Sequence, residues 1–187
     1  QFVIAPDNFQ RVMTFVQDVT LNYGYQSSYV KSNEYRDEDW KATKDLIALA
    51  ASVDSVSIVG VATQSYASPE GEITLNEDLA MDRANSANKA VSRELGRKKI
   101  ELDESAMQAM PKGEDWDGFK KAMRASDIAD KDLILRVLEM YSDKNKREEE
   151  IKNIAKTYKE IEDRILPDLR RSQVAITYTV EGYTDEE

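Results

Sequence analysis

SVSIVGVATQSYASPEGEITLNEDLAMDRANSANKAVSREL, residues 55–95, is the stretch that decides the expected fold. β-Branched and apolar residues over Ser55–Ala62 predict a strand, and the Ser, Pro and Gly residues of Tyr66–Gly71 predict a loop after it. Between Leu75 and Gly96 there is no Pro or Gly, and apolar side chains recur at the spacing of one helix face. The stretch therefore predicts a strand, a polar loop and a long helix.

Two polar residues, Asn76 and Arg83, lie near the start of the predicted helix. They project within roughly 20° of each other, at the edge of the apolar face. In one interpretation Asn76 caps the helix, and Arg83 reaches the surface or joins a structural ion pair. In the other, a guanidinium held near the free N–H groups of a helix start binds a ligand carboxylate. The pattern alone leaves both interpretations open.

The series YASPEG-x₄-N-x-x-LA-x-x-RA resembles the OmpA C-terminal domain, a peptidoglycan-binding module that also occurs in peptidoglycan-associated lipoproteins and flagellar motor proteins. The positions that match the family are Gly60, Tyr66, Asn76, Leu79, Ala80, Arg83 and Ala84. The wording ASPEG looks like the OmpA-like proteins of Bacteroidetes. The extra residues Val61–Ser65 separate Gly60 from Tyr66, so we expect either a bulge at the strand end or a longer loop.

The resemblance implies a role for each residue of this motif. Arg83 is expected to bind a carboxylate of diaminopimelate in the peptidoglycan stem peptide, with Asn76 shaping the same loop and helix start. The family's Asp, which holds the diaminopimelate amino group, falls on Ser68 here. A neutral hydroxyl cannot pair with an ammonium group. Either Glu70 or Glu72 substitutes for it, or this copy binds differently or not at all.

Composition narrows the function further. The chain has 187 residues, a formal charge of −10, and neither Cys nor His. The negative charge argues against nucleic acid and anionic membranes as partners, and the missing His argues against hydrolase triads and zinc sites. No apolar run is long enough to span a bilayer, so no direct membrane insertion of this stretch is expected, and no cofactor is expected either. The start at Gln1 suggests a mature or trimmed piece.

The N-terminal part is expected to add two strands and a helix. Short strands are predicted over Phe2–Ile4 and over Val19–Tyr29, and an amphipathic helix over Asp37–Ala51. Three tyrosines share one side of the second strand: Tyr23, Tyr25 and Tyr29. They indicate either packing on an edge strand or a platform for stacking on sugars. The basic Arg97–Lys99 cluster indicates either a helix C-terminus or a contact to an anionic wall polymer or partner protein.

Residues 103–169 are expected to be a helical insertion before the last strand. A short strand is predicted over Ile100–Leu102 and a turn of helix over Ser105–Met110. A helical hairpin over residues 115–141 and a charged helix over residues 144–166 follow. The segments Asp115–Gly118 (DWDG) and Pro167–Arg170 (PDLR) again look like Bacteroidetes members of the family.

The clearest predicted strand is Ser172–Val180, where apolar and polar residues alternate. It resembles the family's last strand, whose R-R-V start falls on Arg170 and Arg171. Arg171 is therefore a candidate second site residue, although a salt bridge to an acidic neighbour explains it equally well.

We expect an α+β chain, a single OmpA-like domain over residues 1–187 with a two-layer sandwich of β-α-β-α-β core and an acidic flexible tail over residues 182–187. The expected function is a non-catalytic periplasmic module that anchors an outer-membrane or surface protein to peptidoglycan. Its candidate ligand-binding residues are Ser68, Glu70, Asn76, Arg83 and Arg171. The alternative is an OmpA-like fold with a drifted site that serves the assembly of surface or fimbrial structures. An enzyme using Glu70 and Glu72 as acid and base is the least expected class.

Overall fold

The computed structural model describes residues 11–182, apart from the side chain of residue 155, and within that range shows a mixed α/β chain with four strands and seven α-helices. In chain order the elements are β1 (Val12–Asn22), α1 (Glu38–Ser52), β2 (Val56–Ala67), α2 (Ile73–Arg97), β3 (Met107–Glu114), α3 (Trp116–Ala125), α4 (Lys131–Met140), α5 (Lys144–Asn153), α6 (Ala155–Arg164), α7 (Leu166–Leu169) and β4 (Arg171–Glu181). Among the helices of residues 11–182, none combines the length and the apolar composition that a membrane span requires.

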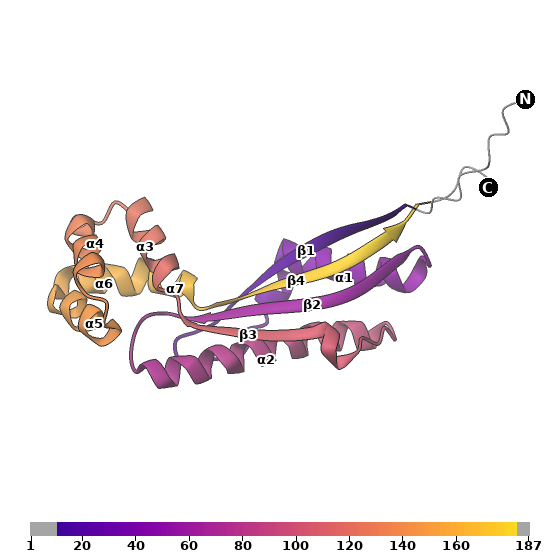
Figure 1. Cartoon of the computed structure of the whole chain (residues 1–187), viewed down its shortest axis with the longest axis horizontal. Coiled ribbons are helices and arrows are strands. Elements are labelled where there is room, and N and C mark those ends of the chain that lie inside the picture. The colour runs from indigo at the N-terminus through magenta and orange to yellow at the C-terminus, as the bar shows by residue number, and fades with distance from the viewer. Residues whose placement is uncertain (1–10, 183–187) are drawn as a thin grey trace, which may run out of the picture.

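The strands form one sheet in the order β1-β4-β2-β3 (Figure 1). β4 runs antiparallel to both of its neighbours, and β3 runs parallel to β2 after the crossover through α2. α1 and α2 pack on the sheet around one apolar core, to which β1 contributes Val19 and Leu21, and β4 contributes Val174 and Ile176. These side chains alternate along their strands, as expected where one face of a sheet is covered.

The positions of β2 that face the core change from even-numbered to odd-numbered residues along the strand. Val56 and Ile58 face the core at its start, whereas Val61 and Thr63 do so further on. A register shift between Ile58 and Gly60 against β4 explains the change, because one extra residue in a strand reverses the faces that follow. The residues that are extra relative to the family pattern continue the strand as far as Ala67. A second shift, between Ser65 and Tyr66 against β3, comes from one extra residue in β3, because Ser65 pairs with Pro111 and Tyr66 with Gly113, so it is not the bulge predicted for the end of β2.

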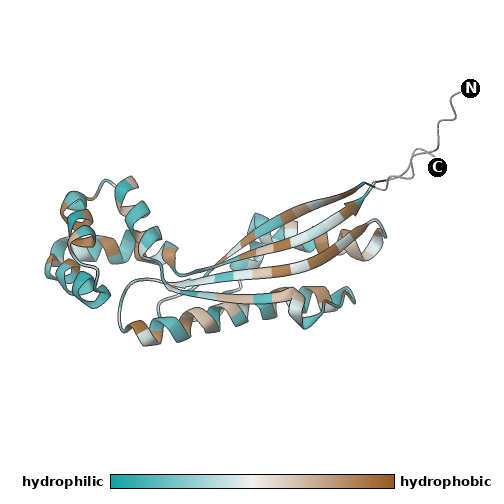
Figure 2. Ribbon diagram, in the orientation of Figure 1, coloured by the Kyte–Doolittle hydropathy of each residue, from teal (hydrophilic) through white to brown (hydrophobic). Residues whose placement is uncertain are grey.

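Helices α3–α7, residues 116–169, form a separate group that we call the helical module. It has its own apolar core, which includes Phe119, Met123, Ile134 and Ile161. In Figure 1 the module lies at one end of the sheet, and the described chain ends lie at the other, where the Gly182 amide donates to the Arg11 carbonyl at 2.9 Å. Figure 2 shows apolar residues along the strands of the sheet, while α5 is mainly hydrophilic.

β1 begins and ends earlier in the sequence than the strand predicted over Val19–Tyr29. It spans Val12–Asn22, not Val19–Tyr29, because the chain leaves the sheet at a turn in which Gln26 has a left-handed φ of 48°. Tyr23 is consequently buried, whereas Tyr25 and Tyr29 are 57% and 72% exposed. The three tyrosines therefore do not form one strand face.

The region after α2 also differs from the prediction. Ile100–Leu102 forms no strand, and the turn of helix predicted over Ser105–Met110 is a short 3₁₀ turn at Glu104–Ala106 followed by β3. The lengthened β2 provides the edge along which β3 pairs. Pro111 is tolerated there because β3 is an edge strand.

The charged segment over residues 144–166 is not one helix, because it breaks at Ile154 between α5 and α6. The strand predicted over Phe2–Ile4 and residues 183–187 of the predicted tail lie outside the described residues.

Candidate functional site

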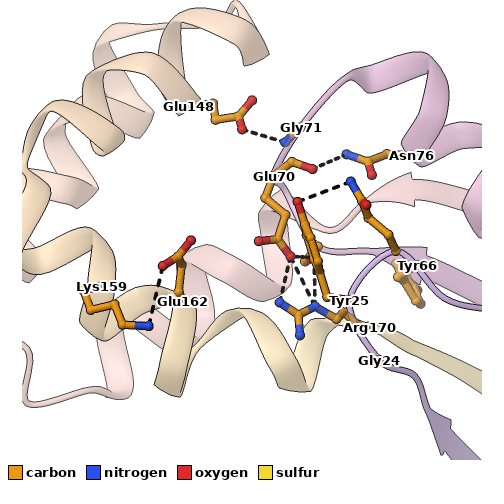
Figure 3. A network of polar contacts seen from close by, with 12 residues as sticks. Gly24, Tyr25, Tyr66, Glu70, Gly71, Asn76, Glu148, Lys159, Glu162 and Arg170 are labelled. Atoms are coloured by element: carbon orange, nitrogen blue, oxygen red, sulfur yellow. Dashed lines mark hydrogen bonds and ion pairs between the residues drawn. The ribbon is translucent and has the colours of Figure 1, made fainter.

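The loop Ser68–Glu72 joins β2 to α2 and faces the helical module (Figure 3). Glu70, at its centre, is 8% exposed, and its Oε1 accepts hydrogen bonds from Ser68 Oγ at 2.5 Å and from Arg170 Nη2 at 2.8 Å. Arg170 Nε also donates to this oxygen, at 3.2 Å. Two of the predicted ligand-binding residues thus contact each other, and the carboxylate is neutralised by an arginine at the start of β4.

Arg83 is fully buried, at 0% exposure, on the sheet side of α2. Its Nε donates to the Ser27 carbonyl at 2.9 Å, Nη1 to the Tyr66 carbonyl at 2.8 Å and Nη2 to the Gly24 carbonyl at 3.1 Å. Its guanidinium also lies over the Tyr23 ring, 5.2 Å from the ring centroid. Arg83 therefore neither reaches the surface nor joins a close ion pair, so that interpretation is wrong. It does bind oxygens, but those oxygens are backbone carbonyls of the chain itself.

Asn76 does not cap α2, because the N-cap residue is Glu72, four positions earlier. The Asn76 side-chain amide instead donates to the Glu70 carbonyl and to Glu114 Oε1, both at 2.9 Å. Glu114 ends β3, and its second oxygen accepts from the indole of Trp116 at 2.8 Å. Asn76 therefore fixes the shape of the loop and connects it to the first helix of the helical module.

Arg171 forms a salt bridge, as one of its two interpretations predicted. Its Nη1 lies 2.6 Å from Asp115 Oδ2, and its guanidinium lies 4.4 Å from the centroid of the Tyr66 ring. Asp115 is the N-cap of α3 and also accepts from the Gly118 amide at 2.9 Å. The DWDG segment is therefore a helix cap whose carboxylate is shared with the last strand.

A further contact comes from α5, where Glu148 accepts from the Gly71 amide at 2.6 Å (Figure 3). Glu148 also pairs with Lys152 at 2.5 Å. Ser68, Glu70 and Asn76 therefore meet at the loop 68–72, whereas Arg83 and Arg171 contact Tyr66 at the end of β2 and not the loop itself. Sequence reasoning missed Asp115 and Glu114 as partners of Arg171 and Asn76, missed Glu148 as a partner of the loop, and treated Arg170 only as part of a doublet. The DWDG and PDLR segments held the signal, because each places a charge at a junction between the sheet and the helical module.

Beside this network lies an open hollow of about 330 Å³, between the loop and the first turns of α2. Its lining is strongly acidic, with the side chains of Glu72, Asp78 and Asp82 next to Glu70 and the apolar Leu75 and Leu79. A hollow of this charge suits a ligand ammonium group. Arg83 does not line it, so a ligand there would not meet the guanidinium in this conformation.

Burial shifts the pKa values of Arg83 and of Tyr23, whose ring lies beside the guanidinium. Desolvation lowers the pKa of Arg83 to about 10, and desolvation raises the pKa of Tyr23 to about 12. The nearby charges of Arg170 and Glu70 act on Arg83 in opposite directions. At neutral pH both groups are protonated, so the guanidinium is a buried cation. Within residues 11–182, no group of three or more acidic residues is arranged to hold a metal ion.

No family model matches this sequence, and a comparison with curated proteins found no match. The interpretation of the site therefore depends on its own geometry.

Proposed function

We propose that this chain is a non-catalytic module of the bacterial cell envelope, of OmpA-like type, whose carboxylate-binding arginine has become part of a structural joint. In this proposal the module lies in the periplasm, associated with the outer membrane, and serves the assembly of surface or fimbrial structures. The resemblance over residues 60–84 motivates the envelope setting. The drift from wall binding to assembly rests on the burial of Arg83 and on the contacts of the loop 68–72.

The observation that carries the proposal is the burial of Arg83 beneath the chain's own carbonyl groups. Three of its N–H groups are already used, and the segment that supplies two of the acceptors, Gly24 and Ser27, covers it. The nearest carboxylate of the motif, Glu70, is likewise engaged by Ser68 and Arg170. A stem-peptide carboxylate would have to displace these contacts, and each net hydrogen bond lost costs about 1 kcal/mol.

Calorimetric titration with a diaminopimelate-containing stem peptide tests the proposal. The expected result is no binding by the wild-type protein. Photo-crosslinking in native envelopes, with the reactive group at the exposed Met140 of the helical module, is expected to yield adducts with envelope proteins and not with muropeptides. Stem-peptide binding that survives in Arg97→Ala, an exposed control on the same helix, but is lost in Arg83→Lys would contradict the proposal.

A second candidate is direct binding of the stem peptide, which the acidic hollow favours. In this candidate Glu72, Asp78 and Asp82 bind the diaminopimelate ammonium group in place of the family's Asp. This candidate predicts that Asp78→Asn with Asp82→Asn weakens binding at least tenfold, whereas Asp54→Asn, an exposed control, leaves it unchanged. A gain of binding only in Ser68→Asp would instead indicate a wall-binding fold that has lost its ligand.

A further inference from the structure

A small hollow of about 190 Å³ lies further along α2 than the acidic one, on the same face of the helix. Its walls come from the segment after β1, through Ser28, Tyr29 and Val30, and from α2, through Ser86, Lys89 and Arg93, with Tyr35 beside them. Pockets for drug-sized ligands usually measure 300–1,000 Å³. A hollow of this size therefore suits a single small ring or side chain.

The charge of this hollow is opposite to that of the protein as a whole. The chain carries −10, yet the lining contains two cations, Lys89 and Arg93, and no carboxylate. Among residues 11–182 neither cation takes part in an ion pair, and Glu94, the adjacent carboxylate on α2, is 2.6 Å from Arg97. Because Ser86, Lys89 and Arg93 are spaced by three and four residues, they share one stripe of the helix. The stripe offers a hydroxyl and two positive charges to an anion.

The aromatic wall is exposed, but the segment that carries it is held in place. Tyr29 is 72% exposed, whereas the next residue, Val30, is 7% exposed in the core of the sandwich. The carbonyl of Ser27, two residues before Tyr29, accepts a hydrogen bond from Arg83, so the buried arginine holds this segment against α2. The position of Tyr29 beside Lys89 is therefore set by the same network that closes the candidate site.

An exposed ring, hydroxyl groups and cations in one shallow hollow match the chemistry of an acidic sugar. The face of an aromatic ring carries partial negative charge, which attracts the C–H groups on one face of a saccharide. Hydroxyl side chains bind the ring oxygens, and ammonium or guanidinium groups bind a carboxylate or phosphate. We propose that this hollow binds one saccharide ring bearing a carboxylate or phosphate, with Tyr29 as the stacking surface and Lys89 and Arg93 as the anion contacts.

Titration of the full chain followed by two-dimensional NMR tests the proposal with three sugars: glucuronic acid, glucose 6-phosphate and glucose. Expected dissociation constants for one of the two acidic sugars are about 1–10 mM, with glucose at least tenfold weaker and shifts confined to Tyr29, Ser86 and Lys89. The preferred acid tells whether the anion is a carboxylate or a phosphate. Raising the salt concentration is expected to weaken the binding of the acidic sugar but not the binding of glucose.

Variants separate the two parts of the site. Tyr29→Ala is expected to weaken the binding of all three sugars about fivefold or more. Lys89→Gln combined with Arg93→Gln is expected to abolish the preference for the acidic sugars over glucose. Lys98→Gln with Lys99→Gln removes the same charge from exposed positions further along the chain and is expected to change nothing. Absence of shifts at 50 mM of both acids, or equal shifts in both double variants, overturns the proposal. Tighter binding of an N-acetylated, amidated Glu-Glu dipeptide than of either acid would replace the sugar by an acidic peptide.

Discussion

Arg83 holds together three parts of the chain that are distant in sequence. It donates to the carbonyls of Gly24 and Ser27 in the segment after β1, and to that of Tyr66 at the end of β2. A planar group with five donors in fixed directions fits this task, and the single ammonium group of a lysine does not. The Tyr23 ring beside it and the protein dipoles around it compensate for the water that the cation loses on folding.

Replacing Arg83 by alanine is therefore expected to destabilise the protein by about 3 kcal/mol or more, since it removes three hydrogen bonds and leaves a cavity where a fully buried side chain had been. Urea unfolding followed by circular dichroism measures this. Arg97→Ala, at a position where the side chain is 60% exposed, is expected to change stability by less than about 0.5 kcal/mol. Equal midpoints for the two variants would show that the carbonyl contacts of Arg83 add nothing to stability.

Tyr23 predicts a dependence of stability on alkaline pH. Its hydroxyl contacts Ser172 at 2.8 Å and donates to the Arg83 carbonyl at 3.0 Å, and burial raises its pKa from 10 to about 12. Below pH 10 the phenol is protonated in both states, and the stability is fully present. As the pH rises from 10 to 12, the unfolded chain loses the proton while the folded chain retains it, so up to about 2–3 kcal/mol is lost.

The comparison with Tyr23→Phe isolates this contribution. The lowered pKa of Arg83 acts in the opposite direction over the same range, but the arginine is present in both proteins. The advantage of the wild type over Tyr23→Phe, measured by urea unfolding at pH 9, is expected to shrink by pH 11. A difference between the two proteins that stays constant across this range would argue against burial as the cause of the shift.

At the scale of elements, α3 requires a glycine at position 118, because a side chain there would collide with the residue that caps the helix. A Cβ there would lie 2.6 Å from Asp115 Cγ, in the space of the carboxylate that caps α3 and pairs with Arg171. Gly118→Ala is expected to cost about 1–3 kcal/mol, although alanine normally favours a helix interior over glycine. A Cβ added at Gly96, in α2, would meet nothing within 4 Å, so Gly96→Ala is the matched control and is expected to stabilise by up to about 1 kcal/mol. Thermal unfolding of the two variants beside the wild type measures both effects, and a Gly118→Ala protein as stable as Gly96→Ala would show that the cap can move aside.

The order of most elements could be predicted because each has a local signal. The apolar spacing of Ile73–Arg97 and the alternation of Arg171–Glu181 show in the sequence itself. β3 could not be predicted in this way, since Met107–Glu114 contains a proline and a glycine and has only a weak alternation. Its strand conformation comes from pairing with β2, a partner more than 40 residues earlier, and no local pattern records such a pairing.

The contacts of the candidate site could likewise be predicted only in part from the sequence. The motif predicts that Ser68, Glu70, Asn76 and Arg83 lie together, and the structure joins the first three at one loop but buries Arg83 beside the end of β2. The motif could not show that Arg170 and Arg171 would each meet a carboxylate across the junction, at Glu70 and Asp115. These partners come from segments between 56 and 100 residues apart, and their pairing depends on how the helical module is seated.

At the scale of the whole molecule, two apolar cores meet at one polar corner. The sandwich core contains Trp40, and the helical module's core has Trp116 packed against it. The corner between them contains the Glu70–Arg170 pair, the Arg171–Asp115 pair and the bond from Glu148 to the Gly71 amide. Because both ion pairs are mostly buried, we expect them to couple the unfolding of the two cores.

The two tryptophans make this coupling measurable, since the chain has only these two. Trp40→Phe leaves Trp116 to report on the helical module, and Trp116→Phe leaves Trp40 to report on the sandwich. With the corner intact, the two fluorescence transitions in urea are expected to coincide.

When Glu70→Gln and Arg170→Gln are added to both backgrounds, the Trp116 transition is expected to move to a lower urea concentration than the Trp40 transition, because the helical module loses a charged anchor. Glu72→Gln, on the same loop, is the control and is expected to leave the transitions together. Transitions that still coincide without the Glu70–Arg170 pair would mean that the backbone crossings at Asp115 and Arg170 alone are enough to make the two cores unfold as one.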